Sequence, residues 1–145
     1  MRRSIRRVML LMLVAGIAVG CGNKNNSSTP TGPTTLPTVL TETFSGTLNK
    51  NSAFTHPFAV GDAGDVSVFL TVSVDASNPD NIIPIGVSLG TWNGSSCAVV
   101  IANDNVAQGS SITGRATAAT NLCVRVYDVG FVPGSANYEL LIDHP

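Results

Sequence analysis

The chain has 145 residues, of which 43% are hydrophobic and 12% charged, and its formal net charge is −1. From Val39 to the end there are about 105 residues, enough for one compact core and not for two. The few basic residues outside the first twenty are widely scattered, which disfavours the basic surface on which nucleic-acid binding depends.

The first twenty residues have the three parts of a secretion signal. Four arginines stand between positions 2 and 7, an apolar run follows at residues 8–19, and small residues precede Cys21. A bilayer core about 30 Å thick takes about 20 apolar residues to cross, so this run is too short for a membrane helix. The segment 1–20 is therefore predicted to be a cleaved signal peptide.

The residues Ala18-Val19-Gly20-Cys21 resemble the lipobox of bacterial lipoproteins. In that family the cysteine is acylated, for example with palmitate, and becomes the first residue of the mature chain. The resemblance implies an exported protein held in the cell envelope by a lipid on Cys21. Gly22 follows in place of the Asp that favours inner-membrane retention, so we expect the outer membrane. Cleavage would leave four basic and nine acidic residues, which further disfavours nucleic acid as a partner.

Residues 21–38 begin with Cys21 and continue as a linker of Asn, Ser, Thr, Pro and Gly with few apolar residues. Such a segment buries too little surface to offset the entropy of ordering it, so we expect a flexible tether. Its root-mean-square span, about 5 to 6 Å times the square root of its length, would hold a domain a few nanometres from the lipid.

Residues 39–145 are predicted to form a single all-β domain. Apolar and polar residues alternate along its segments, and turn residues separate these segments, with Asn103-Asp104-Asn105 among the expected loops. No segment has a helical stripe over three turns. The pattern predicts a jelly-roll-like antiparallel β-sandwich of seven to eight strands. The expected strands are residues 42–48, 54–60, 65–74, 83–92, 97–102, 111–116, 122–127 and 138–142.

Cys97 and Cys123 are the two cysteines that remain once Cys21 is modified. An exported protein meets oxidising conditions, so we expect them to form a disulfide bond. The alternatives are a reactive cysteine or a zinc site, but the chain has neither a CxxC motif nor an evident histidine partner for these two residues.

The order of the predicted strands resembles that of the bacterial pre-peptidase C-terminal domain and its collagen-binding relatives. The resemblance rests on five segments: Phe44–Leu48, Phe58–Val60, Gly64–Val68, Val124–Asp128 and Asn137–Pro145. It implies a β-sandwich that serves as a non-catalytic module for secretion, solubility or substrate binding, with calcium bound in some members. Members usually follow a catalytic domain, whereas this chain is expected to be an autonomous, lipid-tethered module.

The segment Gly86-Val87-Ser88-Leu89-Gly90 matches the GxSxG pattern of serine hydrolases. That pattern works only where a strained serine joins a strand to a helix, and here it falls inside an alternating strand. His56 and His144 are expected to be surface residues. We therefore expect no catalysis and no catalytic residues, and keep a small serine hydrolase only as a remote alternative.

The acidic loop after residue 74 is a candidate calcium site. Asp75, Asn78, Asp80 and Asn81 lie close together and carry the oxygen ligands that calcium prefers. The alternative is that these residues form turns through local hydrogen bonds, because their spacing does not match an EF-hand loop.

Two aromatic residues are candidates for ligand binding. Trp92 and Tyr127 would form a stacking platform for a sugar or a collagen-like ligand. The alternative for Trp92 is a structural role as a lid on one end of the sandwich.

These observations favour an envelope lipoprotein whose sandwich is a non-catalytic binding or structural module without a required cofactor. Its partners would be the membrane, through the lipid, and an extracellular protein or polysaccharide. The alternative is an accessory subunit that tethers or assists a separately encoded exported hydrolase.

Overall fold

The computed structural model describes residues 38–145. The predicted signal peptide, the lipidation site Cys21 and nearly all of the linker lie outside the described residues. No helix in the part of the chain that the structure describes has the length and apolar character to cross a membrane.

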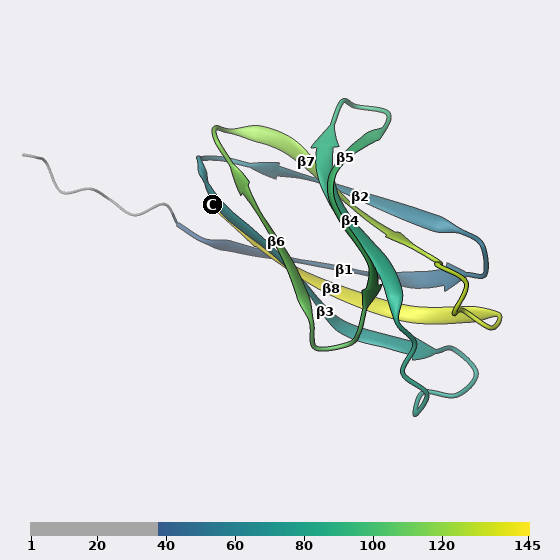
Figure 1. The fold of residues 1–145 in the computed structure, drawn as a ribbon. Coiled ribbons are helices and arrows are strands. Elements are labelled where there is room, and N and C mark those ends of the chain that lie inside the picture. Colours follow the sequence, from purple (N-terminus) through teal and green to yellow (C-terminus); the bar gives the residue numbers. More distant parts are fainter. Residues whose placement is uncertain (1–37) are drawn as a thin grey trace, which may run out of the picture. The chain divides into compact units, whose positions relative to one another are not determined.

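Two four-stranded antiparallel sheets make up the domain (Figure 1). The first sheet has the strand order β1-β8-β3-β6, and the second has the order β2-β7-β4-β5. This confirms the predicted all-β antiparallel sandwich. The strands are β1 Leu40–Asn49, β2 Ala53–Val60, β3 Gly64–Asp75, β4 Ile85–Trp92, β5 Cys97–Val106, β6 Ser111–Ala116, β7 Thr120–Tyr127 and β8 Ser135–His144.

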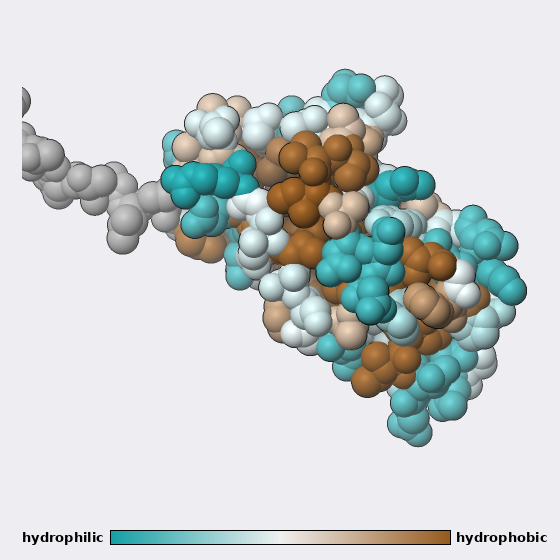
Figure 2. Space-filling model, viewed as in Figure 1, coloured by the Kyte–Doolittle hydropathy of each residue, from teal (hydrophilic) through white to brown (hydrophobic). Residues whose placement is uncertain are grey.

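The core lies between the two sheets and follows from the alternation in the sequence. Val66, Val68 and Leu70 of β3 are buried, and so are Val124 and Val126 of β7. Since successive side chains of a strand point to opposite faces, each of these two strands turns one apolar row toward the other sheet. Burial of these rows is the main favourable term in folding. Strand β5 differs, because its Val99 and Val100 are exposed. Hydrophobic side chains also lie among hydrophilic ones on the face of the molecule shown in Figure 2.

Strand β4 is buried on both faces over Ile85–Gly90. Its outer face is covered because two neighbours approach the backbone closely at the glycines. The Tyr127 ring occupies the space that a side chain at Gly86 would need, and the Ala98 backbone occupies that space at Gly90. Strand β5 thus passes over β4 at Gly90, and a residue with a side chain does not fit there without movement.

The expected loop at residues 103–105 is wrong, because these residues lie in a strand. Asn103, Asp104 and Asn105 belong to β5, where Asn103 pairs with Val87. The β4–β5 pairing shifts register between Ile85 and Val87, and the Asn103 side chain accepts a hydrogen bond from the Asn105 backbone. Strand β5 continues through these polar residues because an irregular edge strand tolerates local hydrogen bonding of this kind.

Candidate functional site

The predicted disulfide bond between Cys97 and Cys123 is confirmed, with the two sulfur atoms 2.05 Å apart. Cys97 opens β5 and Cys123 lies in β7, while β4 stands between these strands in the sheet. The bond therefore spans β4 and ties the start of β5, where the β4–β5 hairpin turns back, directly to β7.

Trp92, at the end of β4, lines an open hollow of about 560 Å³. Strands β2 and β7 and the β4–β5 turn supply the other walls. None of the residues that line it carries a formal charge. They are Pro57, Phe58, Ala59, Trp92, Asn93, Gly94 and Asn121.

The two asparagines of this hollow have different roles. The Asn93 side-chain oxygen accepts hydrogen bonds from the backbone nitrogens of Ser95 and Ser96, and its nitrogen donates to the Ser96 hydroxyl at 2.9 Å. Asn93 therefore shapes the turn that follows Trp92. Asn121 is exposed on β7, so its amide is open to a ligand.

The structure does not bring Trp92 and Tyr127 together as one platform. Tyr127 pairs with Gly86, six residues before Trp92 on the same strand, which corresponds to about 20 Å at about 3.3 Å per residue. The Tyr127 hydroxyl donates to a carboxylate oxygen of Asp104. Burial and this hydrogen bond raise the pKa of Tyr127 to about 12. Trp92 is therefore the partly exposed aromatic residue of the hollow, beside the buried Phe58, and Tyr127 packs over Gly86 near the far end of the strand.

The candidate calcium residues lie at the end of β3, for Asp75, and in the tight loop after it, for the other three. The Asp75 carboxylate accepts hydrogen bonds from the backbone nitrogen and the hydroxyl of Ser77, at 2.9 and 2.7 Å. These bonds hold the pKa of Asp75 below its ordinary value. Backbone bonds then run from Asn78 to Asp75, from Asn81 to Asn78 and from Asp75 to Asn81.

These contacts match the turn-forming alternative for this loop. Both Ser77 contacts use the same carboxylate oxygen of Asp75, and Asp80 is exposed. Within residues 38–145, no group of three or more His, Cys, Asp or Glu side chains is placed to hold a metal ion. The calcium site stays a prediction.

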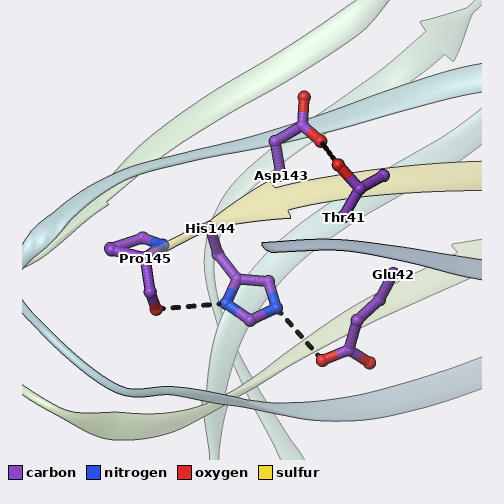
Figure 3. Close-up of polar contacts among 5 residues, drawn as sticks. All are labelled: Thr41, Glu42, Asp143, His144 and Pro145. Carbon is purple, nitrogen blue, oxygen red and sulfur yellow. Dashed lines mark hydrogen bonds and ion pairs between the residues drawn. The ribbon is translucent and has the colours of Figure 1, made fainter. Parts of the chain in front are cut away.

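His144 is fully buried, so the expected surface position is wrong. Its Nε2 atom lies 3.0 Å from a Glu42 carboxylate oxygen, and its Nδ1 atom lies 3.3 Å from the backbone oxygen of Pro145 (Figure 3). Strand β8 continues to residue 144, and the alternation places His144 on the same inner face as Leu140 and Ile142.

His56 also faces the interior and is partly buried. It stacks on Phe44 with ring centroids 4.9 Å apart, and its Nε2 atom lies 2.8 Å from the Tyr138 hydroxyl oxygen. Burial lowers the pKa of His56 below its ordinary value because it disfavours the charged imidazole. Both histidines therefore link strands at the β1 and β2 side of the sandwich.

Ser88 lies in the middle of β4 and is 1% exposed. Its hydroxyl has no hydrogen-bond partner among the described residues. The strand-to-helix turn that a GxSxG nucleophile needs is replaced here by a continuous strand. Close packing at Gly86 and Gly90 accounts for the two glycines of the pattern.

Sequence reasoning missed Pro57 and Asn121 as neighbours of Trp92. They lie on β2 and β7, far from Trp92 along the chain, and strand pairing brings them together. Knowledge of the strand register would have identified them, because Pro57 pairs with Cys123 and Cys123 pairs with Gly90, two residues before Trp92.

No model of a known protein family matches the chain, and no curated protein matches it either. Among solved structures, a mitogen from Yersinia pseudotuberculosis is similar over 76% of this chain and 88% of its own, at 13% identity and a TM-score of 0.50. A protein of the disulfide-linked pili of Bacillus endospore appendages aligns over 74% of this chain and 88% of its own, at 14% identity and a TM-score of 0.37. At these identities the likeness to the mitogen concerns the fold alone.

Proposed function

We propose that this protein is an exported lipoprotein, anchored in the bacterial envelope through Cys21, whose sandwich is a non-catalytic binding module for a neutral polysaccharide. The observation that carries the binding role is the hollow at Trp92. It combines an aromatic ring, uncharged walls and the open amide of Asn121.

This combination suits a sugar better than a charged ligand. A pyranose ring has an apolar face that stacks on an aromatic side chain, and its hydroxyls bond to amides. A charged ligand would be desolvated against uncharged walls without an opposite charge nearby. The disulfide bond supports the proposal because it holds the Trp92 hairpin in place before a ligand arrives.

The binding role is tested by titrating the full chain with soluble neutral oligosaccharides, such as β-1,4-linked glucose and N-acetylglucosamine oligomers. The chain has one tryptophan, so its fluorescence reports on Trp92 alone. We expect a saturable change with one sugar class. By calorimetry, Trp92→Ala should abolish that binding and Asn121→Ala should weaken it about tenfold, which corresponds to about 1.4 kcal/mol.

Two variants serve as controls. Phe131 is an exposed aromatic residue outside the hollow, so Phe131→Ala should bind as the wild type does. Tyr127→Phe should also retain binding if the hollow alone holds the ligand. Equal loss in the Trp92 and Phe131 variants, or no response to any neutral oligosaccharide, would refute this binding role.

The anchoring role has its own test. Intact mass spectrometry of the membrane-extracted protein should show a chain that begins at residue 21 with acyl groups on it. Cys21→Ser should keep the leader and carry no lipid. An unprocessed, unacylated wild-type chain would exclude the anchor and leave the binding role of the sandwich to be judged separately.

A further inference from the structure

We infer that strand β1 is an interface through which two copies of this chain pair edge to edge. A sheet edge presents unpaired backbone N–H and C=O groups, and proteins usually protect such edges with proline, bulges or short strands. The sandwich has four edge strands, and three of them carry such a feature.

The edge strands β2, β5 and β6 are each protected against pairing with another chain in a different way. Strand β2 contains Pro57, which has no N–H to donate. Strand β5 has two register shifts, and β6 has only six residues. Strand β1 runs for ten residues in unbroken register with β8, from Leu40 opposite His144 to Asn49 opposite Ser135, and contains no proline or lysine (Figure 1).

The β1 strands of two copies can pair with each other about a two-fold axis. When two β1 strands pair antiparallel about a two-fold axis at Phe44, each Leu40, which is 55% exposed, comes to lie opposite Leu48 of the second copy, which is already buried in its own core. On the outer face, Thr43 then lies opposite Ser45, and Thr41 lies opposite Thr47. Pairs of β-branched and hydroxyl residues stabilise antiparallel strands.

The charges also permit this pairing. Glu42 is the only charged residue of β1, and in this register it lies opposite Gly46 rather than opposite another acid. The Glu42 carboxylate is already held by His144 within its own copy. A two-fold contact uses the β1 edge of both copies, so it closes at a dimer and does not grow into a fibre.

The length of the edge sets the strength of the pairing. Ten residues rise about 33 Å, and an edge contact of that length falls among small interfaces, below about 1,200 Å². We therefore expect a reversible dimer with a dissociation constant on the order of 10 to 100 µM. This pairing is independent of the sugar-binding role, because none of the residues that line the Trp92 hollow belongs to β1.

The test is sedimentation equilibrium of the full chain in density-matched detergent, from about 1 µM to about 1 mM, a range that brackets this affinity. We expect the wild type to pass from monomer to dimer. Thr43→Lys with Ser45→Lys places four ammonium groups beside the axis and should weaken the dimer at least about tenfold. Both positions are exposed, so the fold should survive, which circular dichroism checks.

The matched control is Ser111→Lys with Thr113→Lys, two exposed positions on the edge strand β6 of the same sheet. This variant should dimerise as the wild type does. In a second experiment, Thr43→Cys with Ser45→Cys should give a covalent dimer on mild oxidation, and Ser111→Cys with Thr113→Cys should not. A wild type that stays monomeric at about 1 mM, or equal loss in both lysine variants, would overturn the inference.

Discussion

The Nε2 atom of His56 lies 2.8 Å from the hydroxyl oxygen of Tyr138, which links β2 of one sheet to β8 of the other. The pKa of His56 is lowered from its ordinary value of 6.5 because burial disfavours the charged ring. The unfolded chain therefore binds the proton more readily than the folded chain. The contribution of His56 to the free energy of unfolding should be fully present above pH 6.5. It should be lost as the pH falls from 6.5 through the lower pKa of the folded state.

This prediction is checked by urea unfolding at about pH 7.5 and about pH 5.5, on either side of the ordinary histidine pKa. The wild type should lose more stability over this interval than His56→Gln, which keeps a polar side chain without the titration. Histidine NMR should assign His56 a pKa below 6.5. A midpoint for His56 above that value would contradict the burial argument.

The bond between Cys97 and Cys123 closes a segment with a sequence separation of 26. On the chain-entropy estimate, a loop of this length stabilises the folded state by about 3.5 kcal/mol. The double variant Cys97→Ser with Cys123→Ser should lose free energy of unfolding of about that size, measured by denaturant titration. It should also bind oligosaccharide more weakly, since the start of β5 is no longer bonded to β7 and strand pairing alone holds the Trp92 hairpin. Unchanged stability in the double variant would show that β-sheet pairing alone fixes this hairpin.

Gly90 has no room for a side chain because the Ala98 backbone lies over it. Gly90→Ala should therefore lower the free energy of unfolding by about 2 kcal/mol or more, as overpacking against a backbone does. Gly134→Ala is the matched control, because nothing lies within 4 Å of its added Cβ. Thermal unfolding compares the two, and an equal effect would mean that the crossing of β5 over β4 is not tight.

Substitution of two buried serines should have opposite effects on the free energy of unfolding. The Ser73 hydroxyl donates to the Ile83 carbonyl oxygen at 2.5 Å, whereas the Ser88 hydroxyl has no partner among the described residues. Ser73→Ala should cost about 1 to 3 kcal/mol because it leaves a buried carbonyl without that donor. Ser88→Ala should leave stability unchanged or raise it by about 1 kcal/mol, since it removes a buried hydroxyl that makes no bond.

The Ser88 variant also bears on the hydrolase alternative. If the sandwich is a binding module, Ser88→Ala should have the same background ester hydrolysis as the wild type, measured with a chromogenic ester. A loss of hydrolysis specific to this variant would revive that alternative. A loss of stability as large as that of Ser73→Ala would instead reveal a hydrogen bond at Ser88.

The period-two alternation was enough to predict the sandwich, because burial of one face dictates which residues of Val66–Leu70 are apolar. The disulfide bond was predictable from the number of cysteines. The neighbours of Trp92 on other strands were not predictable, because Pro57 and Asn121 come close to it only through pairing between distant segments. The expected surface position of His144 is wrong because β8 and its alternation of buried and open positions continue to residue 144, which turns this side chain inward.

The bridge across β4 also makes the maturation of this protein depend on its surroundings. In a reducing compartment the two thiols stay separate, and the hairpin that carries Trp92 has only strand pairing to hold it. Once the thiols are oxidised, the hairpin is clamped and the hollow has its final shape. The ligand binding proposed for this hollow would then be weak in newly made molecules and would strengthen once they reach an oxidising environment.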